Sequence, residues 1–481
     1  MKWISKRRIM SFIFMSILIL VAGCVYKSKL PPLCEKLECE KQIIITNVDL
    51  FNGDPDQGIM ENVNILIENG RIIKIGKFPP SGVDAEIIDG KGKMVIPGLI
   101  DAHTHVVSPG SPPWFPVMPG EELIRRNFSS YLYAGITTVY DMGGPLHDLE
   151  KIKADIEAKE QVNPRFFYAG KMLTQKGGHP ERMLKELIPW PVDVMTIGKL
   201  VFLINEPADI APAIKENKAH GATLTKIMVD QIPFGVPSLR EPLIEAIVSE
   251  SKKTDLMVCA HIGSETDLLT ALNSGVRFFA HTPYRSSISD ITIQSIGEKE
   301  IVVIPTLVAF DQAADFFADT LSFSDLEKEI IEPNILEAYI NIPDGGLEAK
   351  DPQFQIWIHE LQVHREIKYE NVRKMKAAGV TLIAGSDSPN VAAVAGGSLH
   401  KEMRLLVEKC GFTPMEAVAS ATSVSGDILG RITGIRGLGR IVVGGPADLV
   451  MLNGDFREDI RRTENIHMVV SNGRIVERKI Q

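Results

Sequence analysis

The chain has 481 residues, of which 44% are hydrophobic and 23% charged, and its formal net charge is -9 at pH 7. This length and composition are typical of a globular protein with a large core and a second, smaller domain. An acidic balance without a basic stripe excludes nucleic acid as an expected partner, and five cysteines are too few for a disulfide scaffold.

The first residues of the chain are typical of an export signal. Basic residues precede an apolar run from 9 to 22, which is short for a membrane span of roughly 20 residues but fits a secretory signal. The run ends Leu20-Val21-Ala22-Gly23-Cys24, which resembles a bacterial lipobox. This resemblance implies a lipoprotein signal peptide over 1–23 and lipidation of Cys24. We therefore expect a lipid-anchored protein on the extracytoplasmic side of a bacterial cell envelope; an uncleaved anchor or a plain secretory signal is the alternative.

Residues 24–41 are rich in Lys, Pro and Glu and are expected to form a lipidated linker. Cys34 and Cys39 lie in this linker. In an oxidising compartment they could pair, and otherwise they are free thiols. In either case we do not expect them to bind a metal.

Strand and turn patterns occur at both ends of the globular part. Apolar runs flank Asn69-Gly70 and again flank Asn472-Gly473, and Asn-Gly between two such runs is the strongest short hairpin signal. Neither end has enough strands for a stable sheet of its own. We therefore predict one small β-sandwich domain built from residues 42–94 and 439–481; two unrelated hairpins are the alternative.

The middle of the chain, residues 95–438, alternates apolar strands with helical stretches. The candidate strands are 95–105, 137–141, 165–169, 223–228, 257–261, 278–281, 301–307 and 381–387. Apolar runs of this kind suit parallel strands that are buried on both faces. Eight such units in roughly 350 residues predict an α/β fold, a (β/α)8 TIM barrel inserted into the β-sandwich. The aromatic-rich segment 311–360 is expected to be a lid, a packing insertion or a dimer contact.

Polar side chains close or interrupt several of these strands. The i, i+2 spacing of His103 and His105 puts both imidazoles on one side of the first strand. Because the carboxyl ends of barrel strands meet at one face, we expect the polar groups of all these strands to converge there. They are His103, His105, Lys226, His261, His281 and Asp387. Imidazole and carboxylate groups suit zinc and similar divalent ions, so the sequence predicts a metal site.

From about residue 42 to 476 the chain resembles the amidohydrolase superfamily. Residues 97–105, Pro-Gly-Leu-Ile-Asp-Ala-His-Thr-His, are similar to its first-strand motif. Residues 445–450, Gly-Pro-Ala-Asp-Leu-Val, are similar to the point where its members re-enter the small β-domain. The subgroup that this chain resembles contains imidazolonepropionase-like proteins and Xaa-Pro or Xaa-Arg dipeptidases.

The resemblance implies two divalent metal ions, with zinc as the first candidate. His103, His105 and Asp387 would hold the first ion. His261 and His281 would hold the second, and Lys226, carboxylated by CO2, would bridge the two. The alternative for Lys226 is an ordinary salt-bridged lysine.

The implied reaction is hydrolysis of a C–N bond in a small amide or peptide. A hydroxide between the ions would attack the polarised carbonyl, with Asp387 as general base. His179, in a Gly-Gly-His loop, is expected to stabilise the oxyanion, and Tyr284 and Arg285 to bind a substrate carboxylate. The alternative for His179 is a solvent-exposed loop histidine. The alternative for Tyr284 and Arg285 is a salt bridge at the start of a helix.

Two other functions are considered. A single-metal aminohydrolase that deaminates a heterocycle often places Glu three residues after the fifth-strand histidine, where this chain has Ser264. A non-catalytic surface binding lipoprotein would be expected to lack a ligand, and none is missing. We therefore expect an enzyme; its exact substrate, its native metal and whether it forms a homo-oligomer are left open by the sequence.

Overall fold

The computed structural model describes residues 34–36, 42–80, 85–117, 120–158, 163–187, 192–348 and 351–479. The expected signal peptide, Cys24, Cys39 and most of the expected linker therefore lie outside the described residues. Within these ranges, no helix is both long and apolar enough to cross a membrane.

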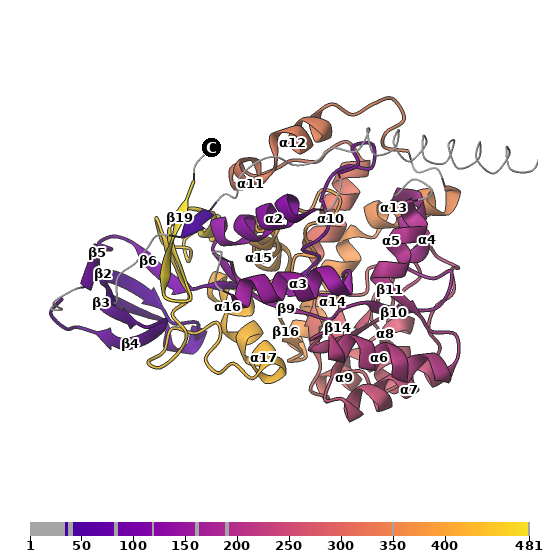
Figure 1. Ribbon diagram of the computed structural model, residues 1–481, viewed down its shortest axis with the longest axis horizontal. Helices are drawn as coiled ribbons and strands as arrows, with labels where there is room; N and C mark the ends of the chain where they lie inside the picture. The colour runs from indigo at the N-terminus through magenta and orange to yellow at the C-terminus, as the bar shows by residue number, and fades with distance from the viewer. Residues whose placement is uncertain are drawn as a thin grey trace, which may run out of the picture.

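Strands from both ends of the chain pair in one nine-stranded sheet (Figure 1). Its strands are β1 (Cys34–Lys36), β2 (Gln42–Phe51), β3 (Ile59–Glu68), β4 (Arg71–Gly76), β5 (Ala85–Asp89), β6 (Met94–Pro97), β17 (Leu449–Leu452), β18 (Ile466–Ser471) and β19 (Arg474–Arg478). The order is β1-β19-β18-β17-β6-β2-β3-β4, with β5 beside β2. The two halves meet where β6 runs antiparallel to β17.

The two Asn-Gly turns lie against each other. Asn69, Gly70, Asn472 and Gly473 all have positive φ, as the tight hairpin turn of this dipeptide requires. The nitrogen of Ala447 donates to the oxygen of Gly70 at 2.9 Å, and the nitrogen of Gly473 donates to the oxygen of Ala447 at 2.9 Å. The pairing of both ends in one sheet agrees with the predicted terminal domain, whose sandwich form stays a prediction.

One strand of this sheet was expected to belong to the linker. Cys34 in β1 lies opposite Arg478 in β19, and its buried thiol donates to the carbonyl oxygen of Ser129 at 3.4 Å. Part of the expected linker is therefore packed onto the folded protein.

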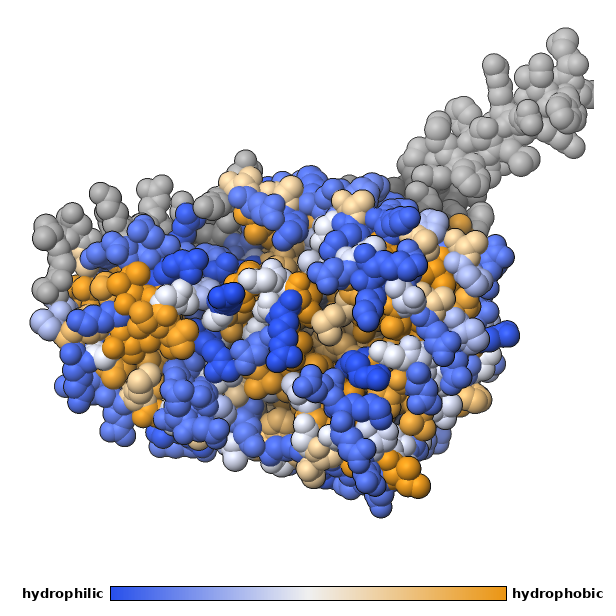
Figure 2. Space-filling model, turned by 90° about the horizontal axis from the view of Figure 1, so that it is seen from below, coloured by the Kyte–Doolittle hydropathy of each residue, from blue (hydrophilic) through white to orange (hydrophobic). Residues whose placement is uncertain are grey.

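Figure 2 shows an apolar patch over the end of the molecule that carries the nine-stranded sheet, and this sheet exposes Ile73 and Ile87.

The middle of the chain forms two parallel sheets. The three-stranded one has β7 (Leu99–Thr104), β8 (Ile136–Asp141) and β9 (Arg165–Tyr168). The seven-stranded one has, in spatial order, β11 (Val201–Leu203), β10 (Met172–Thr174), β12 (Leu224–Met228), β13 (Met257–His261), β14 (Phe278–Ala280), β15 (Val302–Ile304) and β16 (Thr381–Leu382). These parallel sheets confirm the predicted α/β class.

Hydrogen bonds continue from one parallel sheet to the other at two places. The nitrogen of Thr223, before β12, donates to the oxygen of Tyr168 at 3.0 Å. The nitrogen of Ala102 in β7 donates to the oxygen of Ala384, just after β16, at 3.1 Å. These bonds bring the end of β7 and the residues after β16 side by side.

Helices surround these sheets (Figure 1). They are α2 (Glu121–Tyr133), α3 (Leu146–Glu157), α4 (Glu181–Leu187), α5 (Val192–Leu200), α6 (Ile210–Ala219), α7 (Glu241–Lys253), α8 (Glu265–Asn273), α9 (Asp290–Gly297), α10 (Leu307–Phe317), α11 (Asp325–Ile330), α12 (Pro333–Ile340), α13 (Pro352–Val363), α14 (Arg365–Ala377), α15 (Gly397–Cys410), α16 (Pro414–Ser420) and α17 (Ser423–Thr433). Much of the segment 311–360, which was expected to be a lid, a packing insertion or a dimer contact, is helical in α10 to α13.

Candidate metal centre

The polar groups predicted at the strand ends lie close together. The Nε2 atoms of His103 and His105 lie 3.4 and 3.1 Å from Oδ1 of Asp387. One ligand atom each of His103, His281 and Asp387 lie within 4.8 Å of one another. The ring of His261 is centred 4.2 Å from that of His281. The first-strand pair and the residues of three later strands therefore share one site.

Lys226 lies in β12 and is almost fully buried, with 1% of its surface exposed. Its Nζ atom has no hydrogen-bond partner among the described residues, and burial lowers the pKa of its amine. An isolated buried ammonium group is unfavourable by several kcal/mol. A neutral amine in this position is the form that can react with CO2, and the resulting carbamate would offer two oxygens to divalent ions.

Several other buried polar atoms of this cluster have no hydrogen-bond partner within the described part of the chain. They are Nδ1 of His103, Nδ1 of His179 and Oδ1 of Asp387. Buried polar atoms are almost always satisfied in folded proteins. A group of unsatisfied nitrogen and oxygen atoms at one place is what a metal site without its ions presents, so the donor set fits divalent metal.

Hydrogen bonds fix the orientation of two of the imidazoles. Nδ1 of His105 is 2.8 Å from the carbonyl oxygen of Gly143, and Nδ1 of His281 is 2.5 Å from Oγ1 of Thr306. A metal-binding histidine commonly uses its second nitrogen for such a bond. The Nε2 atoms of both histidines are thereby left to face the site.

The electrostatics of the site favour the neutral form of three imidazoles, those of His103, His179 and His281, and neutral imidazole is the form that binds metal. Burial, reinforced by neighbouring cationic groups, holds the pKa of His103, His179 and His281 well below the usual value. The pKa of His105 is raised because the effect of Asp387 outweighs burial.

His179 is buried against this cluster and is not a solvent-exposed loop residue. Its ring is centred 4.7 Å from that of His261, and its carbonyl oxygen accepts a hydrogen bond from Thr174 at 2.6 Å. The Gly-Gly-His loop therefore places an imidazole beside the candidate metal ligands.

Asp230 is a site residue that the sequence analysis did not single out. It follows β12 by two residues, its side chain is fully buried, and its Oδ2 lies 3.5 Å from Nε2 of His261. Burial alone would raise the pKa of Asp230, but the guanidinium of Arg285 and the ring of His261 lower it below its usual value. The available signal was a carboxylate at a strand end, the same signal that pointed to Asp387.

Tyr284 and Arg285 reach Asp230. The hydroxyl of Tyr284 donates to Oδ2 of Asp230 at 3.2 Å, and Nη1 of Arg285 donates to Oδ1. Arg285 also donates to Glu360 at 3.1 Å and to the carbonyl oxygen of Gln231 at 2.6 Å. The predicted role of Tyr284 and Arg285 in binding a substrate carboxylate stays a prediction, and it competes with a role in holding Asp230.

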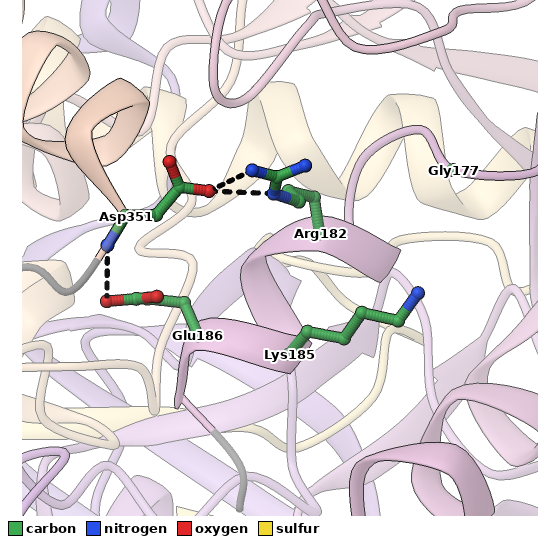
Figure 3. Close-up of a pocket in the computed structure, with 5 residues that line it drawn as sticks. All are labelled: Gly177, Arg182, Lys185, Glu186 and Asp351. Carbon is green, nitrogen blue, oxygen red and sulfur yellow. Dashed lines mark hydrogen bonds and ion pairs between the residues drawn. The ribbon is translucent and has the colours of Figure 1, made fainter. Parts of the chain in front are cut away.

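A cavity of about 270 Å³ lies beside Gly177 (Figure 3). Gly177 belongs to the loop that also contains His179. It is lined by Gly177, Arg182, Lys185, Glu186 and Asp351. Nε of Arg182 donates to Asp351 at 2.7 Å, and the nitrogen of Asp351 donates to Glu186 at 3.3 Å. These bonds link α4 to the start of α13.

Residues 94–476 match the amidohydrolase family. The imidazolonepropionase of Geobacillus kaustophilus is 37% identical over 114 residues, which are 22% of this chain and 24% of that protein. The chain thus matches about a quarter of that curated relative's length.

Two solved structures are similar over most of their length. One is an amidohydrolase, 28% identical, with a TM-score of 0.69 over 90% of this chain and 98% of the other. The second is a prolidase complexed with N-methylphosphonate-L-proline, 25% identical, with a TM-score of 0.72 over 91% of this chain and 100% of the other. With the family match across most of the sequence, these findings show that the chain belongs to the amidohydrolase family.

Proposed function

We propose that this amidohydrolase family member is a metal-dependent hydrolase that cleaves C–N bonds in small amides or peptides, as a dipeptidase or an amidase. The observation that carries the proposal is the convergence of His103, His105, His281 and Asp387 near the buried Lys226. Nζ of Lys226 has no hydrogen-bond partner among the described residues. The similarity to a prolidase supports a peptide substrate.

The architecture in this proposal is a (β/α)8 barrel, residues 95–438, inserted into a β-sandwich of residues 42–94 and 439–481. The hydrogen bonds that join the two parallel sheets at Thr223 and Ala102 support a closed barrel. Barrel enzymes carry their active sites at the carboxyl ends of the strands, and His261 and Asp387 lie at such ends.

The residues would hold two divalent ions, with zinc as the first candidate. His103, His105 and Asp387 would bind one ion, His261 and His281 the other, and carboxylated Lys226 both. When bound, the ions would polarise the scissile carbonyl and lower the pKa of an attacking water.

The side chains of the chain would move the protons of the reaction. Asp387 would accept a proton from the attacking water at its carboxylate and deliver it to the leaving nitrogen, so that the C–N bond breaks with a neutral amine as product. His179 is buried and its low pKa keeps the ring neutral. In the tautomer that directs its N–H toward the substrate, it would donate a hydrogen bond to the carbonyl oxygen as negative charge develops there.

The location of the protein is a second part of the proposal. The basic and apolar start of the chain and the lipobox-like residues before Cys24 support a lipid-anchored protein in a bacterial cell envelope. An extracytoplasmic hydrolase would there meet small peptides and amides from outside the cell.

The test uses the full-length protein, purified with added zinc and bicarbonate, and a library of dipeptides and N-acyl amino acids. Free amino acid and ammonia are measured separately, with the Asp387→Asn variant as control. We expect release of amino acid without ammonia. Release of ammonia would instead indicate a deaminase, and the absence of both products would contradict the proposed dipeptidase or amidase.

A further inference from the structure

Asp230 contacts His261 through both its backbone and its side chain. The backbone nitrogens of Val229 and Asp230 both donate to the carbonyl oxygen of His261 at 3.1 Å. These bonds bind the loop after β12 to the end of β13. They bring the buried Oδ2 of Asp230 to 3.5 Å from Nε2 of His261, an ion-pair distance that is longer than an ordinary hydrogen bond.

The chain makes room for this carboxylate at Gly263, two residues beyond His261. A Cβ atom at position 263 would lie 2.3 to 2.5 Å from the carboxylate atoms of Asp230. No side chain fits at that distance, so the space that a larger residue would fill is occupied by the Asp230 carboxylate.

Two residues of the loop after β14 hold the carboxylate from the other side. Tyr284 and Arg285 donate to Asp230 through their side chains. Their backbone nitrogens donate to the oxygen of Gly263 at 2.9 and 3.1 Å. The loops after three successive strands, β12, β13 and β14, are therefore joined around one buried charge.

Helix α13 of the segment 311–360 completes this arrangement. Nε1 of Trp357 donates to the hydroxyl oxygen of Tyr284 at 3.0 Å, and Oε2 of Glu360 accepts a hydrogen bond from Nε of Arg285 at 3.1 Å. Trp357 and Glu360 are three positions apart on one helix, so they contact neighbouring residues of the same loop.

We propose that Asp230 is a positioning residue for the metal centre, and that Arg285, Tyr284 and helix α13 hold it in place. This inference rests on the proposed function, because it takes His261 as a metal ligand. Nε2 of His261 faces Asp230, so Nδ1 is the ring nitrogen left for an ion. A carboxylate in this place fixes the tautomer of the ring and strengthens it as a ligand. Helix α13 is then a support of the site and not a free lid.

The experiment measures metal binding by the metal-free full-length protein. Co²⁺ is titrated in, its visible absorption is followed, and the bound ions are counted by equilibrium dialysis. In Asp230→Asn we expect one of the two ions to bind about 10- to 100-fold more weakly, with a changed Co²⁺ spectrum, while the other ion binds as in the unaltered protein. Glu360→Gln is expected to weaken the same ion by a smaller factor.

A matched control comes from the same segment. Asp315 of helix α10 forms an ion pair of 2.6 Å with Arg365 of helix α14. Asp315→Asn removes this pair but no contact of Asp230, so it should leave both ions bound as before. If Asp230→Asn does not fold, Glu360→Gln and Arg285→Lys decide the question by the same titration.

Two results would overturn the inference. One is unchanged Co²⁺ affinity and spectrum in both the Asp230 and the Glu360 variants. The other is an Arg285→Lys variant in which KM for a cleaved dipeptide rises while both metal affinities stay the same, because Arg285 would then serve the substrate. The titration needs no substrate, so failure of the dipeptidase proposal would show separately, as absent turnover in a protein that binds metal normally.

Discussion

Three residues at the ends of parallel strands hold a left-handed backbone conformation. The φ angles are 72° for His281, 49° for Thr306 and 57° for Asp387. Such conformations are unfavourable for residues with a side chain, by about 1–3 kcal/mol each. Backbone hydrogen bonds stabilise them: the nitrogen of Asp387 donates to His103 at 2.7 Å, and that of His281 to Ile304 at 2.8 Å. The fold thus aims two candidate ligands into the site at a conformational cost.

At Asp387, the change to Asn separates proton transfer from metal binding. Asparagine keeps the size of the side chain and one coordinating oxygen but cannot accept the proton. We expect kcat to fall by about 10²–10⁴-fold, with most of the bound metal retained in elemental analysis. Asp427→Asn, which alters an exposed carboxylate paired with Arg440, is the control. Near-normal kcat in Asp387→Asn would exclude Asp387 as the general base.

Glu402 gives the protein a measurable dependence of stability on pH. Burial raises the pKa of this carboxyl from 4.5 to about 8, although Oε2 accepts a hydrogen bond from the nitrogen of Val308 at 2.8 Å. Between these two pKa values the native state holds a proton that the unfolded state has lost. The free energy of unfolding should therefore fall as pH rises through this window, by at most about 1.4 kcal/mol per pH unit from this group.

The change Glu402→Gln removes this titration. Relative to the unaltered protein, the variant should gain stability progressively from pH 5 to pH 8, as measured by denaturant unfolding at a series of pH values. A stability difference that stays constant with pH, or that shrinks as pH rises, would show that Glu402 is ionised in the native protein.

Individual candidate ligands could be proposed from the sequence because each stands at the end of an apolar run. His261, His281 and Asp387 are such residues, and their role as ligands stays a prediction. Asp230 was missed because its importance depends on Arg285 and Gly263, which lie far along the chain and meet it only in the folded protein. The partners of Arg285 could not be read from the sequence for the same reason.

At the scale of elements, the end of β7 and the residues after β16 approach closely at Gly385. A Cβ atom at position 385 would lie 2.8 Å from the nitrogen of His103 and 2.6 Å from Cγ2 of Ile304. The glycine therefore sets the spacing between the first strand, which leads to two candidate ligands, and the residues that lead to Asp387.

Gly385→Ala should push these segments apart. We expect a loss of about 1–3 kcal/mol in the free energy of unfolding, as for other overpacked cores, together with weaker zinc binding. Gly198→Ala is the control, because a Cβ atom there meets nothing within 4 Å and should leave zinc binding unchanged. Unaltered stability and zinc binding in Gly385→Ala would mean that the strands can separate without loss.

Element boundaries were less predictable than element types. The candidate strand 95–105 is divided at Gly98 into β6, which pairs with β17, and β7, which pairs with β8. A continuous apolar run contains no sign of which sheet each half joins. The candidate strand 301–307 is shorter, because helix α10 begins at Leu307. The helices within 311–360 depend on aromatic contacts such as Phe316 with Tyr339.

At the scale of the whole molecule, the two ends of the chain meet in one sheet, and the segment between them carries the candidate metal centre. This plan followed from the sequence because two Asn-Gly hairpins at opposite ends each lacked enough strands to be stable alone. Strands of both ends pair in the nine-stranded sheet, while the division into domains stays a prediction. What the sequence pattern did not contain was the strand β1, whose three residues pair with β19 inside the expected linker.

In the proposed metal centre, the buried Lys226 bridges two metal ions as a carbamate. The metal content of the full-length protein and of Lys226→Ala, both purified with zinc and bicarbonate, tests this bridge. We expect about two ions per chain in the unaltered protein, as in two-metal hydrolases, and a loss of bound metal and turnover in Lys226→Ala. About one ion per chain in both proteins would contradict the bridge and favour a single-metal site.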